Sequence, residues 1–570
     1  MKTNKNTNAG EFGKILLVLL PFWDPEIPPS GISYLKSFLQ QHGYTVKTVD
    51  ANMEEELKEV YHRYFETLKE NIPLEKRGNF YKIAHTVLRN HLMAHLHYTE
   101  QGDYLDVVKS VIFKTFFCEV DENRVHLLTG FVRRYFDHLE TYFLHLLETE
   151  KPALLGLSVY EDTLPSSLFA FKITREKYPH IKTVMGGGVF TDFLAPGSPD
   201  LARLLERTES TIDNVFIGEG ENLFLEYLTG KLPQSQRVYT LEDINGKNLD
   251  LSTVEIADFS DFDLRHYPYL AAYASRSCPY QCSFCSETTQ WGKYRKKDAQ
   301  QVVDELMLLY EKYRYQSFLM SDSLLNPIIT DLAHAMIAAG KVVYWDGYLR
   351  IDEKTRDPET TLLWRRGGFY RARLGVESGS PRVLELMDKK ITPGQIRRGL
   401  SGLAHAGVKT TTYWVVGYPG ETEEDFRQTL ALIEEQRDNI YEADCTPFHY
   451  FPTARMGMDR EKDESLPLYT EKAAELLIIQ KRYLDGEPSR EEIYRRMWRF
   501  TEHCHRIGVP NPYSINDVYK ADERWKKLHK NAVPSLTEFN DPDIYIDEAV
   551  NVGRLITAAN ILEDDNGFDF

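Results

Sequence analysis

The decisive stretch of this sequence is Ser277-Cys278-Pro-Tyr-Gln-Cys282-Ser-Phe-Cys285, in which three cysteines have the spacing C-x3-C-x2-C. Thiolates are the usual ligands of iron–sulfur clusters. Three close thiolates without a fourth nearby leave one metal position open, which is typical of a working site. A structural zinc site needs four ligands, and no second Cys/His pair stands at a suitable spacing. The motif therefore predicts a reactive metal centre at Cys278, Cys282 and Cys285.

The cysteine motif follows the first of a series of predicted strands, most of which are separated by segments with helical spacing. These strands are expected at residues 270–277, 317–321, 342–350, 371–377, 411–417 and 445–451. Strands that alternate with helices are typical of parallel sheets, and six such repeats predict a partial or complete parallel barrel. Because barrel enzymes work at the carboxyl ends of their strands, the motif would lie on the working face.

The N-terminal half shows a second strand–helix alternation. Ile15–Leu20 is a continuous apolar run, as expected for a strand that is buried on both faces. Helices are expected at residues 31–42 and 164–178, and further strands at 44–49, 153–159, 183–185 and, as the last one, 214–217. This pattern predicts a doubly wound parallel sheet, with ligands beyond the carboxyl ends of its strands.

The remaining stretches lie outside these two patterns. Residues of about 53–148 are charged and aromatic with helical periodicity, which indicates a helical insertion in the first sheet domain. The stretch at 231–265 is polar and irregular, and the chain beyond about 460 is mostly helical and charged. We therefore expect an α/β chain with a Rossmann-type domain at 1–235, a linker at 236–265, a (β/α)6-type partial barrel at 266–458 and a mainly helical C-terminal domain at 459–570.

Composition narrows the classes of function. The 570 residues are 42% apolar and 12% aromatic, which is ample for burial in several domains. The formal net charge of −18 argues against a nucleic-acid partner, which would need a basic face. Six cysteines, three of them clustered, favour metal ligation in a reducing compartment over a disulfide scaffold. Because the apolar stretch near the N-terminus is too short for a signal core or a membrane span, we expect a cytoplasmic protein.

With an aromatic residue, Phe284, before its last cysteine, the motif resembles that of the radical S-adenosylmethionine (SAM) superfamily. The resemblance implies a [4Fe–4S] cluster on the three cysteines, with the amino and carboxylate groups of SAM on the open iron. It also implies that reduction of the cluster cleaves SAM and yields a 5′-deoxyadenosyl radical, which abstracts hydrogen from the substrate. A low-potential flavodoxin or ferredoxin is the expected electron donor.

Further stretches match the superfamily in order along the barrel. Asp322 ends the second strand, where the family contacts the amino group of SAM, although the common Gly-Gly-Glu form is absent. Arg350 ends the third strand and is either a partner of the SAM carboxylate or half of a strand-end salt bridge. In Leu374–Ser380, the residues Glu377 and Ser378 are candidates for polar contacts to SAM. The stretches Gly417–Glu421 and Phe451–Thr453 resemble the turns after the fifth and sixth strands.

The N-terminal half resembles the cobalamin-binding domain that precedes the barrel in a large subfamily, the class B radical methylases. Glycines at strand ends let a large flat ligand approach the backbone. The resemblance assigns cobalamin contacts to Gly31, Ser158, Gly186, Gly187, Gly218 and Glu219. Each glycine taken alone is better explained as a turn residue. No Asp-x-His-x-x-Gly motif supplies a lower cobalt ligand. Many members of the subfamily lack this motif, and some have lost the cofactor.

If cobalamin binds, the resemblance implies methylation or rearrangement at an unactivated carbon of a peptide or another natural product. The first alternative is a cobalamin-independent peptide epimerase, which returns a hydrogen atom from a cysteine thiol. Cys445 and Cys504 are its candidate donors, and inert packing is their other interpretation. A cobalamin-binding sensor without turnover is the second alternative, against which the intact cysteine motif speaks. No motif identifies the small-molecule or peptide substrate.

Overall fold

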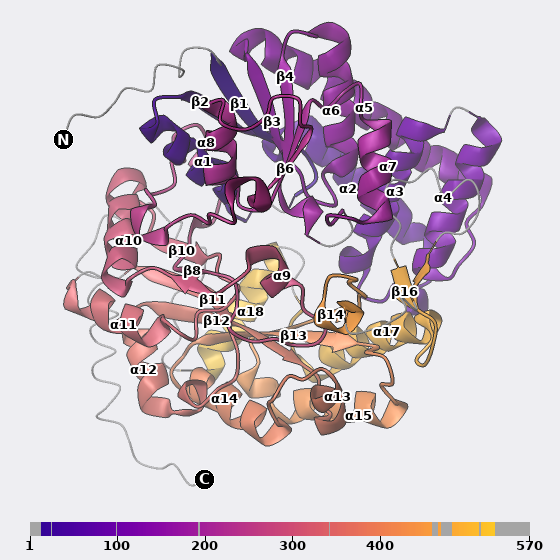
Figure 1. Cartoon of the computed structure of the whole chain (residues 1–570). Coiled ribbons are helices and arrows are strands. Elements are labelled where there is room, and N and C mark those ends of the chain that lie inside the picture. The colour runs from indigo at the N-terminus through magenta and orange to yellow at the C-terminus, as the bar shows by residue number, and fades with distance from the viewer. Residues whose placement is uncertain are drawn as a thin grey trace. The chain divides into compact units, whose positions relative to one another are not determined.

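The computed structural model describes residues 13–529, except 24, 25, 99, 192, 193, 341, 342, 459–464, 469–481 and 512–514. The chain divides into two compact units, each built on a parallel sheet of six strands (Figure 1). The first unit comprises residues 1–267, 289–291 and 449–485, and the second comprises residues 268–288, 292–448 and 486–570. The predicted α/β class is confirmed. The domain limits expected at residues 235, 265 and 458 stay a prediction.

The sheet of the first unit has the strand order β2-β1-β3-β4-β5-β6, and all neighbouring strands are parallel. Its strands are β1 (Lys14–Leu19), β2 (Thr45–Asp50), β3 (Leu154–Ser158), β4 (Lys182–Gly186), β5 (Asn214–Ile217) and β6 (Val238–Thr240), and its helices are α1 (Ser30–Gln41), α6 (Leu164–Lys177), α7 (Pro199–Arg207) and α8 (Gly220–Leu228). The first five strands follow the flavodoxin-like order. Ligands bind such sheets at the carboxyl ends, where the strand order reverses, here between β1 and β3.

Neither β6 nor α7 of this unit was predicted. β6 lies in the stretch expected to be a linker, so the expectation that residues 214–217 form the last strand was wrong. This strand is only three residues long, too short for a visible pattern, but the ring of Tyr239 is buried and stacks on that of Phe216 at 5.0 Å. The short helix α7 was also missed, although Ser198 caps its N-terminus and Pro199 opens its first turn.

The predicted helical insertion is present between β2 and β3. It consists of α2 (Glu55–Asn71), α3 (Phe80–His97), α4 (Gln101–Phe116) and α5 (Glu122–Glu150). His91 is buried at its centre, bonded to the hydroxyls of Tyr64 at 2.9 Å and Tyr104 at 2.7 Å. Burial lowers the pKa of His91 to about 3, so this histidine is a neutral packing residue.

The sheet of the second unit has the order β14-β13-β12-β11-β10-β7 and is parallel throughout. Its strands are β7 (Leu270–Ala272), β10 (Ser317–Met320), β11 (Tyr344–Leu349), β12 (Phe369–Glu377), β13 (Lys409–Val416) and β14 (Glu442–Pro447). The main helices between them are α10 (Ala299–Tyr313), α11 (Ile329–Ala338), α12 (Pro358–Arg366), α13 (Pro381–Leu386), α14 (Pro393–His405) and α15 (Glu423–Glu435). Because β7 and β14 do not pair with each other, the predicted barrel is partial.

The first predicted barrel strand is shorter than expected. β7 ends at Ala272, and the chain then forms β8 (Ser275–Arg276), which pairs antiparallel with β9 (Arg295–Lys296). The break occurs because the backbone N–H of Ala274 donates to the carboxylate of Asp322 at 3.0 Å instead of to a neighbouring strand. The short helix α9 (Glu287–Trp291) follows the cysteine motif.

Two long helices beyond residue 486 belong to the second unit. They are α17 (Arg490–Ile507) and α18 (Ile515–Leu528). α17 packs against α15 and β14, and Lys409 of β13 forms a buried ion pair with Asp522 of α18. The first unit also contains the short elements α16 (Arg455–Met458), β15 (Ser465–Pro467) and β16 (Arg482–Leu484). Within the described ranges, no helix has the length and apolar character needed to cross a membrane.

Candidate active site at the carboxyl ends of the barrel strands

The three predicted cysteines lie on one loop between β8 and α9, and all three are partly buried. Burial raises the pKa of the Cys285 thiol to about 12 and also raises that of Cys278, on which Arg350 and Lys389 act in the opposite direction. The charges of Cys278 and Cys282 act in the same direction as burial on the pKa of Cys285, so the three thiols lie near one another. As a donor set, three thiols beside two cations suit an iron–sulfur cluster.

The cysteine loop is anchored through Ser283, which sequence reasoning had not singled out. Its backbone N–H donates to the carbonyl of Met387 at 3.0 Å, and its hydroxyl lies 2.9 Å from the hydroxyl of Tyr418. The Tyr418 hydroxyl also donates to the carbonyl of Leu386 at 3.1 Å. The predicted turn at residues 417–421 therefore has a direct role, because it holds the loop that carries the cysteines.

Arg350 lies beside this loop. Its Nη1 is 3.5 Å from the Sγ of Cys282, and its guanidinium stacks over the ring of Tyr280 with 4.1 Å between Cζ and the ring centre. Its backbone N–H donates to the Oδ1 of Asn326 at 2.8 Å. Across the described residues Arg350 has no ion pair to a carboxylate, so the salt-bridge interpretation finds no partner there. Its assignment to the SAM carboxylate stays a prediction.

Glu377 and Ser378, at the end of β12, have different surroundings. Glu377 is buried with a φ of +68° and accepts from the Nζ of Lys389 at 2.7 Å. The same Nζ lies 5.9 Å from the ring centre of Phe284, so the Glu377–Lys389 pair adjoins the cysteine loop. Ser378 is fully buried instead, and its hydroxyl lies 3.2 Å from that of Thr429 on α15. Only Glu377 is thus seen beside the loop.

Asp322 is enclosed by its own chain. Its carboxylate accepts from the backbone N–H of Ala274 and from the hydroxyl of Ser275, and burial raises its pKa to about 6. These bonds join the end of β10 to the connection between β7 and β8. A contact of Asp322 with SAM stays a prediction.

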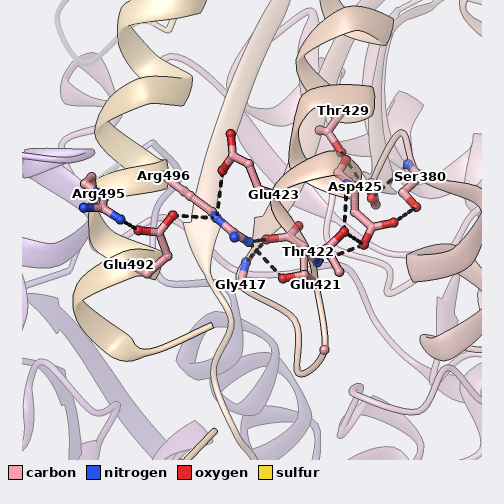
Figure 2. A network of polar contacts seen from close by, with 12 residues as sticks. Ser380, Gly417, Glu421, Thr422, Glu423, Asp425, Thr429, Glu492, Arg495 and Arg496 are labelled. Atoms are coloured by element: carbon pink, nitrogen blue, oxygen red, sulfur yellow. Dashed lines mark hydrogen bonds and ion pairs between the residues drawn. The ribbon is translucent and has the colours of Figure 1, made fainter. Parts of the chain in front are cut away.

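The turn after β13 is braced by α17 (Figure 2). The backbone N–H of Gly417 donates to the Oε2 of Glu421 at 2.8 Å, and Arg496 of α17 donates to the same oxygen at 2.9 Å. Arg496 also donates to the backbone carbonyl of Glu421 at 3.0 Å. Gly417 has a φ of +83°, and a Cβ built there would lie 2.3 Å from Ile493 of α17. The helix therefore fixes the turn that holds the cysteine loop.

The residues predicted to contact cobalamin lie at the carboxyl ends of β3, β4 and β5, except Gly31, which lies in the first turn of α1. Gly187 has a φ of +112°, and a Cβ there would lie 2.5 Å from the backbone of Val159. Glu219 is buried, and its Oε2 accepts from the backbone N–H of Leu249 at 3.0 Å. The chain's own packing therefore accounts for Gly187 and occupies one oxygen of Glu219, and cobalamin contacts at Gly31, Ser158, Gly186, Gly187, Gly218 and Glu219 stay predictions.

The two cysteines proposed as hydrogen donors are buried. Cys445 of β14 is paired in register with Trp414 of β13, whose ring packs 6.3 Å from that of Phe500 on α17. Cys445 therefore lies on the face of the sheet that the helices cover. Cys504 lies within α17, and burial raises its pKa to about 12. This placement supports the packing interpretation for both thiols.

Comparison with known proteins agrees with this geometry. Residues 273–433 match the model of the Radical SAM superfamily. The chain is 24% identical to the anaerobic magnesium-protoporphyrin IX monomethyl ester cyclase of Rubrivivax gelatinosus over 51% of its own length and 55% of the cyclase. It is 25% identical to an uncharacterized methyltransferase of Pyrococcus horikoshii over 50% of its own length and 64% of that protein. The matches thus span less than two thirds of these relatives.

Solved structures resemble the fold over nearly the whole chain. The radical SAM methyltransferase TsrM from Kitasatospora setae, with cobalamin and a [4Fe-4S] cluster bound, covers 97% of this chain and is covered completely, with a TM-score of 0.53 and 14% identity. The cobalamin-dependent SAM radical enzyme OxsB covers 97% of this chain, which covers 81% of OxsB, with a TM-score of 0.53 and 12% identity. Residues 273–433 therefore form a Radical SAM domain, and the chain has the two-sheet fold of TsrM and OxsB.

Proposed function

We propose that the chain is a cobalamin-dependent radical SAM enzyme that methylates, or rearranges, an unactivated carbon of a peptide or another natural product. One observation carries this proposal: a single chain joins a flavodoxin-order sheet to a partial barrel with the cysteine motif. The same combination extends over 97% of the chain in the comparison with TsrM and OxsB, both of which bind cobalamin.

In this proposal the residues of the second unit divide the work at the barrel mouth. Cys278, Cys282 and Cys285 are proposed to hold the cluster, Arg350 to meet the carboxylate of SAM, and Glu377 to make a polar contact with SAM. When bound, the cluster supplies the electron for cleavage of SAM, and cobalamin supplies a methyl carrier. Ser283 keeps the loop against the turn after β13, so that the Cys282 thiol stays beside Arg350.

Cobalamin is proposed at the carboxyl edge of the first sheet, beside Ser158, Gly186, Gly187, Gly218 and Glu219. A sheet of this order offers that edge as its ligand site. The edge has no histidine within a recognised cobalt-ligand motif, so we propose that the cofactor is held without a protein ligand below the cobalt. The electron donor is proposed to be a low-potential flavodoxin or ferredoxin, and the compartment the cytoplasm.

The range of substrates is left open by the relatives, because one is named a cyclase and another a methyltransferase. Both reactions begin from an unactivated carbon in the proposed chemistry. The epimerase alternative gains no support, because Cys445 lies on the helix-covered face of the sheet and Cys504 is buried in α17.

The proposal is tested by anaerobic incubation of the reconstituted enzyme with methyl-deuterated SAM, a low-potential reductant and extracts of the producing cells. We expect 5′-deoxyadenosine and S-adenosylhomocysteine to accumulate together, with deuterium in a product that is absent when cobalamin is withheld. Formation of 5′-deoxyadenosine alone, unchanged without cobalamin, would refute methyl transfer. Rearrangement would be indicated by a new product that forms only with cobalamin and either has the mass of the substrate or contains no deuterium.

A further inference from the structure

The inner face of the barrel sheet carries two tyrosines whose rings stack on each other. Tyr348 of β11 and Tyr413 of β13 have ring centres 6.0 Å apart and ring planes inclined by 25°. The strand between them is β12, and the residue of β12 in register with Tyr413 is Gly375. Because Gly375 has no side chain, the two rings can meet across β12.

The tyrosine pair has exposed ring surface and hydroxyl groups that make no hydrogen bond to the described residues. Tyr348 is 39% exposed although its strand lies inside the sheet with neighbours on both sides. Within the described ranges, neither tyrosine hydroxyl donates or accepts a hydrogen bond. A pair of tyrosines that only filled the barrel would be enclosed, with its hydroxyls bonded. The pair instead offers aromatic surface and two hydroxyls to a ligand.

The charges around the tyrosine pair are already neutralised. Arg373 lies 5.9 Å from the ring centre of Tyr348 and is bonded to Asp346 at 2.9 Å. Two further ion pairs lie on the same face, Arg371–Glu442 at 2.6 Å and Lys389–Glu377 at 2.7 Å. Each of these three cations has its own carboxylate, and Arg350, which lies beside the cysteine loop, is proposed to meet the carboxylate of SAM. A ligand seated there is expected to be uncharged where it touches the rings.

The tyrosine pair also lies next to the reactive end of the barrel. A Cβ built on Gly375 would lie 2.5 Å from the Oε1 of Glu377, whose partner Lys389 adjoins Phe284 of the cysteine loop. The order along this face is thus the tyrosine pair, then the Glu377–Lys389 pair, then the loop of the three cysteines.

We propose that Tyr348 and Tyr413 seat a flat, uncharged ring system of the substrate, such as an aromatic or conjugated ring. This inference rests on the proposed function, since it places that ring below the site of radical formation. Stacking supplies most of the affinity, as is usual for flat rings on aromatic side chains. The tyrosine hydroxyls can then bond to a hydroxyl or carbonyl on the ring.

The test uses the reconstituted full-length enzyme with SAM bound and three probes: 2-naphthol, its saturated counterpart decahydro-2-naphthol, and the anion 2-naphthoate. Titration calorimetry is expected to show 2-naphthol binding at least tenfold tighter than either other probe. Tyr348→Leu and Tyr413→Leu should each weaken 2-naphthol binding about tenfold. Tyr519→Leu is the matched control, because Tyr519 is 40% exposed but lies on α18. Equal binding of 2-naphthol to wild type and both variants would overturn the proposal.

Two further measurements protect this test from a folding artefact and from failure of the proposed function. Tyr348→Phe and Tyr413→Phe keep the rings and should bind 2-naphthol within about threefold of wild type, whereas loss of binding in both would contradict seating by stacking. The Leu variants should still form 5′-deoxyadenosine from SAM. If the purified enzyme binds no cobalamin but still binds 2-naphthol through Tyr348 and Tyr413, the proposed function would be refuted. The inference about the two tyrosines would then still hold.

Discussion

The carboxyl edges of the two sheets carry different kinds of residue. At the edge of the first sheet the notable residues are glycines, and Gly187 is required there by the backbone of Val159. At the edge of the second sheet three thiols lie among cations, with Arg350 at 3.5 Å from Cys282 and Lys389 paired to Glu377. The side chains at the second edge therefore indicate which cofactor it binds, whereas the first edge presents mainly backbone groups to a ligand.

The largest effect is expected at the second edge. Replacement of Cys278, Cys282 and Cys285 by Ala should abolish the absorption of the cluster and the formation of 5′-deoxyadenosine, because no other thiol of the loop can hold iron. The far-ultraviolet circular dichroism should stay that of wild type. Replacement of buried Cys445 by Ala is the control and should leave the cluster in place. Cluster formation in the triple variant would break the account of this edge.

At the first edge the prediction concerns stability. Gly187→Ala should lower the free energy of unfolding by about 4 kcal/mol, because it adds a Cβ clash to a backbone conformation that favours glycine. Gly31→Ala is the matched control, since no atom lies within 4 Å of a Cβ at that position. Its free energy of unfolding should be unchanged or slightly higher. Urea denaturation measures both, and equal stability of the two variants would contradict the packing explanation for Gly187.

The brace between α17 and the turn after β13 should matter for the second edge alone. Arg496→Gln leaves the buried carboxylate of Glu421 without its cation, which should cost about 3 kcal/mol of stability. Because this turn holds Ser283, iron should also be lost faster to a chelator. Arg495→Gln, on the preceding residue, removes a surface pair with Glu492 and should cost less than about 1 kcal/mol. Similar losses in the two variants would show that the brace is not used.

Arg350 offers the finest test of the second edge. A guanidinium that donates to a cluster thiolate should raise the reduction potential of the cluster. Arg350→Gln should therefore lower the ratio of reduced to oxidised cluster about tenfold at a fixed potential, which corresponds to about 59 mV for one electron. Redox titration followed by electron paramagnetic resonance measures this shift. Arg397→Gln, at a surface ion pair with Glu435, should not change the potential, and an unshifted Arg350 variant would remove its role at the cluster.

The reach of sequence reasoning follows the same division. The apolar run from Ile15 and the cysteine spacing are local patterns, and both the buried strand β1 and the loop at the barrel mouth agree with them. β6 was not predicted because a three-residue strand is too short to show a hydrophobic period. The Tyr348–Tyr413 pair could not be predicted from the sequence because it depends on the register of three strands. The only sequence feature that pointed to Ser283 was its position, as a polar residue between two predicted ligands, Cys282 and Cys285.

The central claim, that the first sheet holds cobalamin and the second sheet holds the cluster, is tested most directly by cofactor content. The enzyme is purified without oxygen from cells supplied with cobalamin and analysed for iron, sulfide and cobalamin. The account predicts about four iron atoms and about one cobalamin per chain. We expect Gly187→Ala to lose only cobalamin and the triple cysteine variant to lose only iron. A wild-type enzyme with a full cluster and no cobalamin would contradict the claim for the first sheet.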